Sequence, residues 1–538
     1  MPAHPSRNAS GKNFGTSAYS PSSVRMEAII SFAGIGINYK KLQSKLQHNF
    51  GRLLKALTVT ARALPGQPKH IAIRQETAFT LQGEYIYFPI LLRKQFEMFN
   101  MVYTAHPVSL RALPCVETEF PLFNYQQEMV DKIHKKLLSP YGRFYLHLNT
   151  GLGKTRIAIS IIQKLLYPTL VIVPTKAIQI QWIDELTLLL PHLRVAAYNN
   201  AACKKKDMTS KEYDVIVGII NTLRKKPEQF FEPFGLVVLD EAHELHSPEN
   251  YKIFWKIQLS RILGLSATPL DRPDGMDKII IHHLGQPQRT VSPTTTFSGY
   301  VREIEYQGHP DFVSPVCINE KVSAIATIDK LLQDPSRIQL VVNEAKRLYS
   351  LHTAEPHKWG TDEPYGIIIF VEFRKLLEIF YQALSKEFKD VQIIVPEVAL
   401  LCGGVSNTAL SQAHSASIIL LTYGYGRRGI SFKHMTSIIM ATPRRNNMEQ
   451  ILGRITRQGS DEKKVRIVVD IKDTLSPLSS QVYDRHRIYK KKGYPIFKCS
   501  ASYQQPYSSN EVLIWDPYNE SCLACTTTPP SPSKQKHT

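Results

Sequence analysis

The chain alternates short, continuous apolar runs with longer segments of helical periodicity, and this pattern occurs in two separate blocks. Apolar runs of about five residues bounded by turn residues predict strands that are buried on both faces of a sheet. In the first block the strands are predicted at 144–148, 169–173, 214–218 and 235–239, and the helices at 154–166 and 178–190. In the second block the strands are predicted at 365–371, 417–421, 437–441 and 465–470, and a helix at 373–388. The alternation predicts two α/β lobes, each with a parallel sheet covered by helices on both faces.

The segments around these blocks follow other patterns. Residues 26–118 combine a predicted helix at 39–57 with β-branched and aromatic runs at 55–60 and 84–89, which predicts a small α+β accessory domain. Between the blocks, Pro, Gly and Thr clusters enclose one predicted helix at 338–352. The predicted organisation is a disordered extension (1–25), the accessory domain (26–118), the first lobe (119–290), a connection with an insertion (291–360), the second lobe (361–495) and a C-terminal tail (496–538).

Charge adds a candidate class of partner. The 538 residues exceed one ordinary core, and 66 Lys and Arg against 46 Asp and Glu give a net charge of +20. Such an excess suits a polyanion, because Lys and Arg contacts to phosphates release counterions. Solubility alone is the alternative explanation.

The cysteines and the two ends of the chain bear on the cellular compartment and on the extent of the folded region. Seven scattered cysteines argue against a disulfide framework and favour a reducing compartment. Cys522 and Cys525 form a lone C-x-x-C, for which a solvated tail is favoured over a zinc site. No apolar run reaches the roughly 18 residues that span a bilayer. The first 25 residues lack Asp and Glu, and they are read as disordered or as an extension before a natural start at Met26.

A candidate phosphate-binding loop connects the first predicted strand to its helix. It consists of Thr150, Gly151, Leu152, Gly153, Lys154 and Thr155. Glycines let backbone N–H groups converge on phosphate oxygens at a helix N-terminus. Lys154 would neutralise the β- and γ-phosphates, and the Thr155 hydroxyl would hold Mg²⁺. The strand-turn-helix context disfavours the alternative of a glycine-rich turn with a surface lysine, although Leu148 replaces the first glycine of the broad pattern.

An acidic pair follows the strand predicted at 235–239. Asp240 can face Mg²⁺ through water, and Glu241 can orient and deprotonate the attacking water. A helix start with acidic residues near its positive end is the alternative. The position of the pair after Lys154, on a following strand, favours the catalytic interpretation.

A pair of arginines lies in the second block. Arg454 and Arg457 are three residues apart on a predicted helix, and therefore on one face. Two guanidinium groups on one face can stabilise charge on a transferring phosphoryl group. They could serve a nucleotide held by the first lobe only if the lobes close on one another. On its own, the pair is better explained as part of a solvated basic helix.

In this order, and with Ser266-Ala267-Thr268-Pro269, the motifs resemble those of superfamily 2 helicases of the D-E-A-H type, over roughly residues 119–475. The resemblance implies two tandem RecA-like parallel-sheet lobes with a small N-terminal α+β domain, ATP and Mg²⁺ as cofactors, and nucleic acid as partner. It also implies that Gln126 reads adenine. The run after Pro269, with Arg272, Asp274 and Gly275, is similar to double-strand DNA translocases. The N-terminal block followed by this core resembles the transcript-release helicases of poxviruses and asfarviruses.

The resemblance also assigns roles in coupling and in nucleic-acid binding. Coupling between the nucleotide and the track is assigned to His243, Ser266, Thr268, Gly429 and Gln450. Track contacts are assigned to Thr175, Thr222 and Thr422. Ser431 stands where related proteins often have an acidic residue, although a hydroxyl can still form a hydrogen bond. Five basic clusters either add positive electrostatic potential along the nucleic-acid track or are solvated loops. They lie at 204–206, 224–226, 427–428, 444–445 and 490–492.

The expected function is that of an ATP-dependent helicase or translocase that moves on DNA, in viral transcription termination or transcript release. An ATP-dependent RNA helicase is the alternative within the enzyme class. A nucleic-acid-binding virion protein whose ATPase has lapsed is the alternative of another class. The expected partners are nucleic acid and the viral transcription machinery, in the host cytoplasm or the virion and without a membrane.

Overall fold

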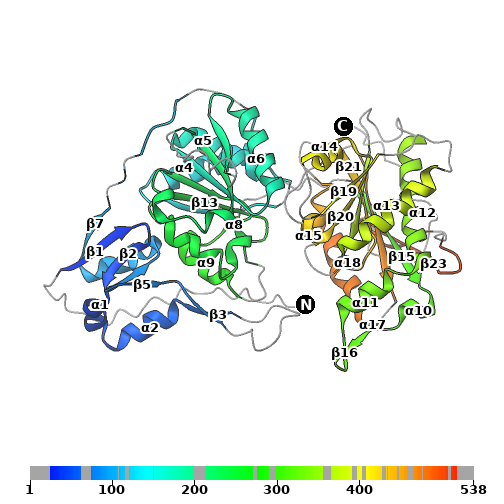
Figure 1. Cartoon of the computed structure of the whole chain (residues 1–538), viewed down its shortest axis with the longest axis horizontal. Helices are drawn as coiled ribbons and strands as arrows, with labels where there is room; N and C mark the ends of the chain where they lie inside the picture. The colour runs from blue at the N-terminus through cyan, green and yellow to red at the C-terminus, as the bar shows by residue number, and fades with distance from the viewer. Residues whose placement is uncertain are drawn as a thin grey trace.

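The computed structural model describes residues 25–61, 74–106, 108, 110–115, 120–149, 151–198, 212–270, 275–289, 298–354, 365–389, 397–402, 407–426, 432, 434–444, 448–456, 464–474, 476–506 and 511–517. They form a small N-terminal domain and two larger α/β lobes (Figure 1). In this part of the chain, no helix combines the length and the apolar character needed to cross a bilayer.

The N-terminal domain is built on a five-stranded sheet in the order β5-β6-β2-β1-β7, in which only β1 and β7 pair in parallel. Strands β3 and β4 form a separate two-stranded sheet. The elements are β1 (Met26–Ser31), β2 (Gly34–Asn38), α1 (Tyr39–Leu46), α2 (His48–Ala56), β3 (Thr58–Ala61), β4 (Arg74–Thr77), β5 (Thr80–Gln82), β6 (Tyr85–Phe88), α3 (Arg93–Phe96) and β7 (Met101–Ala105).

The single helix predicted over 39–57 is wrong in one respect. The chain breaks it into α1 and α2 at Gln47, whose φ of 47° lies in the left-handed region. The break turns both helices toward the sheet, so that Leu42 and Leu46 from α1 and Phe50 from α2 are buried in one core. Burial of three apolar side chains outweighs the cost of the left-handed residue.

Lobe 1 has a parallel sheet of seven strands in the order β10-β11-β9-β12-β13-β8-β14. Its continuous apolar strands are buried on both faces: Val171 packs against the helices on one side, and Ile172 packs into the core on the other. The elements are α4 (Asn124–Leu137), β8 (Arg143–His147), α5 (Lys154–Leu165), β9 (Thr169–Val173), α6 (Lys176–Leu189), β10 (Val195–Tyr198), β11 (Val215–Ile219), α8 (Ile220–Leu223), β12 (Leu236–Leu239), β13 (Arg261–Ser266), α9 (Asp277–Leu284) and β14 (Gln288–Arg289).

Lobe 2 has an eight-stranded sheet in the order β19-β20-β18-β21-β22-β15-β23-β24, parallel except for β24. Its strands are β15 (Gly299–Gln307), β18 (Gly366–Val371), β19 (Val398–Leu401), β20 (Ile418–Thr422), β21 (Met435–Met440), β22 (Arg466–Asp473), β23 (Ile496–Ser502) and β24 (Val512–Trp515), and β16 (Cys317–Ile318) and β17 (Lys321–Val322) form a small hairpin. Its helices are α10 (Pro310–Val313), α11 (Ala324–Leu331), α12 (Pro335–Ala354), α13 (Arg374–Lys389), α14 (Asn407–Ser415), α15 (Tyr423–Gly426), α16 (Met448–Leu452), α17 (Ser476–Ser479) and α18 (Gln481–Lys491).

Two strands of lobe 2 lie where the sequence pattern predicted other segments. Strand β15 was predicted to belong to the connection, yet it pairs with β22 and β23 inside the sheet. Its charged residues hide the strand from a hydrophobicity pattern, although Arg302 is buried in an ion pair with Glu344 at 3.2 Å. Strand β23 was predicted to begin the tail, and its polar alternation conceals it in the same way. The fold class, two tandem RecA-like lobes with a small N-terminal α+β domain, is confirmed.

The N-terminal domain docks on lobe 1 through a buried glutamine. The Gln258 backbone N–H donates to Phe32 O at 3.2 Å, and its side-chain oxygen accepts from the Ile90 N–H at 3.0 Å. Its side-chain amide also lies 2.9 Å from a ring nitrogen of His283. Because Gln258 is fully buried, these bonds satisfy polar groups that water cannot reach.

Candidate nucleotide-binding site

The predicted phosphate loop connects β8 to α5, and its shape depends on two glycines. Gly151 and Gly153 have φ angles of 89° and 79°, which L-residues rarely adopt. A Cβ on Gly153 would lie 2.2 Å from the side-chain nitrogen of Gln126. The loop therefore needs glycine at position 153 both for its backbone angle and for space.

The Gln126 side chain holds the backbone of this loop in place. Its side-chain oxygen accepts from the Phe123 N–H at 3.0 Å, and its nitrogen donates to Leu152 O at 3.1 Å. Leu152 O accepts a second bond, from the Tyr125 hydroxyl at 2.8 Å. Gln126 is 2% exposed, so the structure places it against the loop backbone. Its predicted reading of adenine stays a prediction.

The lysine and threonine of the loop open α5. Lys154 Nζ donates to Leu148 O at 3.2 Å, which folds the ammonium group back over the loop. Leu148 is itself fixed to the neighbouring strand, because its N–H donates to Ser266 O at 3.1 Å. Thr155 follows on the first turn of the helix and is half-buried. Thr150 lies outside the described residues.

The acidic pair lies directly after β12. The Glu241 N–H donates to Asp240 Oδ1 at 2.9 Å, and the Trp182 indole N–H donates to Asp240 Oδ2 at 2.8 Å. Burial raises the pKa of Asp240, and the Glu241 charge raises it further, to about 6, against the opposing effects of Trp182 and Lys154. Asp240 is therefore held in one orientation by two donors.

Glu241 has an unusual backbone and an unusual side chain. Its φ of 47° is in the left-handed region, which a non-glycine residue adopts at a cost. Among the described residues, its buried Oε2 accepts no hydrogen bond and lies 3.4 Å from the Nδ1 of His243. A strained residue that carries an unbonded carboxylate oxygen is typical of a catalytic position.

The donor set fits a divalent cation. The Thr155 hydroxyl and the Asp240 carboxylate are hard oxygen ligands of the kind that Mg²⁺ takes alongside nucleotide phosphates. The nearby unbonded Oε2 of Glu241 shows that acceptor capacity remains free in the same place. These two residues would hold the ion.

Hydrogen bonds link this site to lobe 2. The Nδ1 of His243 lies 3.0 Å from Ser266 Oγ, which also accepts from the Thr268 N–H at 3.1 Å. The Gln450 side chain, from α16 of lobe 2, donates to Thr268 Oγ1 at 3.2 Å. Four of the five predicted coupling residues therefore form one connected path, and Gly429 lies outside the described residues.

Arg454, from lobe 2, is the described member of the predicted arginine pair. It is 4% exposed, and burial lowers the pKa of its guanidinium to about 10, while the charge of Glu241 acts to raise it. The charge of a lobe 1 carboxylate therefore acts on this buried guanidinium, and the contact of Arg454 with a nucleotide stays a prediction. Arg457, the other member of the pair, lies outside the described residues.

The predicted track residues lie where strands end. Thr175 caps α6 after β9, its Oγ1 accepting from the Ile178 N–H at 3.4 Å, and Thr222 follows the neighbouring β11. In lobe 2, Thr422 ends β20 and accepts from the Tyr425 N–H at 3.3 Å. Parallel strands carry Thr175 and Thr222 to one edge of the sheet. Their contact with nucleic acid stays a prediction.

Members of three of the basic clusters form contacts within the protein, and the part of the clusters in binding a track stays a prediction. Arg444 is paired with Glu372 at 2.8 Å, and Lys491 is paired with Glu449 at 2.5 Å. Arg224 donates to the Asn250 side chain at 3.2 Å. The clusters at 204–206 and 427–428, and the cysteines of the tail, lie outside the described residues.

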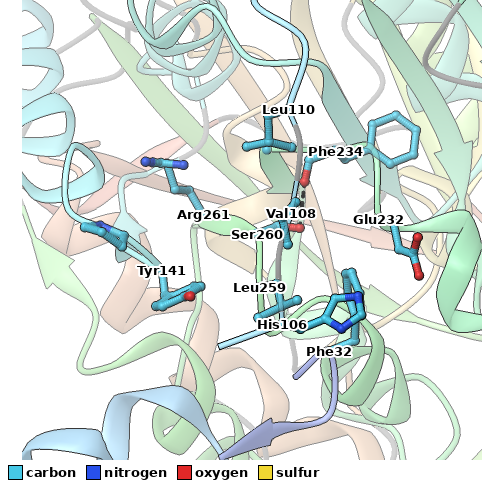
Figure 2. A pocket seen from close by; sticks show the side chains of 12 residues that line it. Phe32, His106, Val108, Leu110, Tyr141, Glu232, Phe234, Leu259, Ser260 and Arg261 are labelled. Carbon is cyan, nitrogen blue, oxygen red and sulfur yellow. Dashed lines mark hydrogen bonds between the residues drawn. The ribbon is translucent and has the colours of Figure 1, made fainter. Parts of the chain in front are cut away.

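A separate cavity of about 170 Å³ lies where the N-terminal domain meets lobe 1 (Figure 2). Phe32 and His106 line it on one side, and Ser260 and Arg261 line it on the other. These lobe 1 residues stand at the beginning of β13, whereas the phosphate loop and Asp240 follow strand ends. The cavity is therefore at the opposite edge of the sheet from the candidate nucleotide site.

Trp182 is the site residue that the motifs did not identify as such. The resemblance assigned Thr175, which caps the same helix, to track contacts, and it gave Trp182 no part in nucleotide binding. Trp182 is 1% exposed, and a buried indole N–H needs an acceptor. The spacing of seven residues from Thr175, two helical turns, was the available signal that α6 reaches back to the strand ends.

Known proteins resemble this chain over part of lobe 1 or over nearly its whole length. The family described as "Type III restriction enzyme, res subunit" matches residues 119–271, within lobe 1. A curated protein of African swine fever virus (isolate Tick/South Africa/Pretoriuskop Pr4/1996), named "Putative ATP-dependent RNA helicase QP509L", is 99% identical over 513 residues, which cover 95% of this chain and 100% of that protein. The chain belongs to this family of viral helicases. The predicted class, an ATP-dependent helicase enzyme, is thereby confirmed.

Other matches to this viral helicase are more distant. "Transcript termination protein A18" of rabbit fibroma virus is 23% identical over 388 residues, which cover 68% of this chain and 76% of that protein. Among solved structures, S. cerevisiae Dbp5 bound to RNA and ADP BeF3 is 14% identical with a TM-score of 0.47, and the match covers 71% of this chain and 94% of that one.

For this helicase, replacing Trp182 with phenylalanine is expected to change the pH dependence of ATP hydrolysis. The ring is retained, but the indole N–H that favours the ionised form of Asp240 is lost, so the pKa of that carboxyl rises further. Because the carboxylate is lost as pH falls through its pKa, the acid limb of kcat/KM should move upward by about one pH unit. A pH–rate series on both proteins measures this shift.

The matched control is Trp255→Phe. Trp255 is also buried, in the core of lobe 1, and packs edge-on against His283. It should lower stability without moving the acid limb. An unchanged limb in Trp182→Phe would mean that the indole does not act on Asp240.

Proposed function

We propose that the chain is a motor that uses ATP hydrolysis to move along nucleic acid by opening and closing its two lobes. The observation that carries the proposal is the hydrogen-bonded path from His243 through Ser266 and Thr268 to Gln450 of lobe 2. A change at the carboxylates of lobe 1 can reach lobe 2 only through contacts of this kind. Such a path is a two-state element that a nucleotide can bias.

The chemistry assigned to each residue follows from its position. Glu241 accepts the proton of the attacking water through its unbonded Oε2. Lys154 neutralises the β- and γ-phosphates, and Arg454 stabilises the charge that develops on the transferring group. The loop N–H groups at Gly151 and Gly153 bind phosphate oxygens. Mg²⁺, when held by Thr155 and Asp240, would supply further charge neutralisation.

Duplex DNA is the favoured track, and transcription termination or transcript release is the favoured setting. The run after Pro269 resembles that of double-strand DNA translocases, and the name of the rabbit fibroma virus relative refers to transcript termination. RNA is the second candidate, since the African swine fever virus relatives are named as RNA helicases. The partner is then the viral transcription machinery, in the host cytoplasm or the virion.

The test is an ATPase panel with duplex DNA, single-stranded DNA and RNA at low salt. We expect duplex DNA to stimulate hydrolysis, and the stimulation to fall steeply with salt, because phosphate contacts release counterions. Lys154→Ala should abolish both basal and stimulated rates, which excludes a contaminating ATPase. Stimulation by RNA alone would favour the second candidate, and a rate that no polymer changes would contradict the motor.

A further inference from the structure

The two helices of the N-terminal domain carry an exposed face of one charge sign. Lys40 and Lys41 on α1, and Arg52 and Lys55 on α2, are all exposed. Among the described residues, none of these four takes part in a salt bridge. Figure 1 shows α1 and α2 along the lower margin of the N-terminal domain.

The charge of this segment is not the ordinary pattern of a solvated helix. From residue 28 to residue 75 the chain contains eight Lys and Arg and no Asp or Glu (Lys40, Lys41, Lys45, Arg52, Lys55, Arg62, Lys69 and Arg74). Helix α4, by contrast, interleaves Glu128 and Asp131 with its lysines, as exposed helices commonly do.

Like charges in this arrangement are unfavourable in the isolated protein. Lys40 and Lys41 lie in the first turn of α1, at the positive end of the helix, and that turn contains no acidic residue of its own. In the part of the chain that the structure describes, the one acidic side chain bonded at this end is that of Glu84, which accepts from the N-cap residue Asn38 at 3.4 Å. On α2, Arg52 and Lys55 are three residues apart and repel one another. A bound polyanion would turn these repulsions into attractions.

The fold holds this face rigidly. Leu42, Leu46 and Phe50 are buried beneath the helices, so the charged side chains are displayed on a packed support. The domain is joined in turn to lobe 1 by the two hydrogen bonds of Gln258 with Phe32 and Ile90. Load on the helices is therefore carried into the lobe that holds the nucleotide.

We propose that the α1–α2 face is a second binding site for a nucleic-acid sugar-phosphate backbone, outside the two-lobe core. It rests on the proposed function, because it assumes that the core itself engages nucleic acid. The site lacks base-reading chemistry: its four cations contact phosphates, which fix position and carry no sequence information. It holds a double-stranded segment on the N-terminal domain while the lobes step.

The test is the quadruple variant Lys40→Gln, Lys41→Gln, Arg52→Gln and Lys55→Gln in the full chain. Binding to a fluorescent DNA duplex at low salt should weaken by on the order of 10- to 100-fold, and the slope of log K against log salt should fall by about three. The ATPase rate at saturating duplex should stay at the wild-type value, with only the half-saturating duplex concentration raised. The melting temperature should stay the same or rise, because like-charge repulsion is removed.

The matched control neutralises Lys132, Lys135, Lys136 and Lys164, on α4 and α5 of lobe 1, where acidic residues are interleaved. It removes the same net charge and should change duplex affinity by less than about threefold. Equal losses in both variants would overturn the proposal, because net charge would then be the cause. An α1–α2 variant that bound duplex with wild-type affinity would overturn it too. So would an α1–α2 variant that lost binding to phosphatidylserine vesicles but kept its binding to duplex. Failure of the motor is a separate result: the wild-type protein would then show no polymer-stimulated ATPase.

Discussion

Replacing Glu241 with glutamine is expected to lower kcat for ATP by at least about 100-fold, while ATP binding stays within about threefold of wild type. Glutamine has the same shape, but it cannot take the proton of the attacking water. The phosphate loop and Asp240, which would bind the nucleotide, are not changed. Steady-state kinetics and titration of a fluorescent ATP analogue measure the two effects separately.

The contrast with Lys154→Ala makes this result specific. The lysine lies over the loop and would neutralise phosphates, so its loss should weaken nucleotide binding as well as turnover. If Glu241→Gln hydrolysed ATP at the wild-type rate, another residue would have to be the base. If both variants bound ATP equally poorly, Glu241 would be a structural residue of the loop.

Replacing Arg454 with alanine is expected to lower kcat by on the order of 1,000-fold, with little change in ADP affinity. The guanidinium belongs to lobe 2, and the charge of Glu241 in lobe 1 acts to raise its pKa. It can stabilise charge on the transferring group only when the lobes are closed. Rapid-quench measurement of the hydrolysis step, alongside ADP binding, isolates this effect.

Arg454→Lys is the companion variant, since it keeps the charge without the planar fork. It should recover only part of the rate, because one ammonium group cannot donate two parallel bonds. Because Arg454 is buried, melting temperatures of both variants must be compared with wild type before the rates are interpreted. Alanine and wild-type enzymes that hydrolyse ATP equally fast would remove lobe closure from the mechanism.

The fold was predictable wherever strands were apolar throughout. The run at 169–173 coincides with β9, because a strand covered on both faces needs no polar residue. Strand β15 was missed because Arg302 and Glu303 are buried in ion pairs, which a hydrophobicity pattern reads as exposure. The break at Gln47 was missed because nothing local marks it, and only packing against the sheet explains it.

The site was predictable to the extent that its chemistry lies in contiguous motifs. Asp240, Glu241 and the glycine loop could be named from spacing alone. Trp182 was not named, because its contact depends on a helix that packs against a strand end 58 residues away, and the spacing from Thr175 was the one sign of it. The burial of Arg454 was equally hidden, since it depends on the packing of lobe 2 around it.

The junction at Gln258 decides how this helicase can be dissected. Cutting away the first hundred residues would deprive its side-chain oxygen of the Ile90 amide and its N–H of the Phe32 carbonyl, and would uncover the buried Leu259. Both polar groups would lose their partners, in an apolar surface that is now exposed to water. A truncated protein made of the two lobes alone is therefore expected to aggregate. Any shortened form of the protein should keep the N-terminal domain.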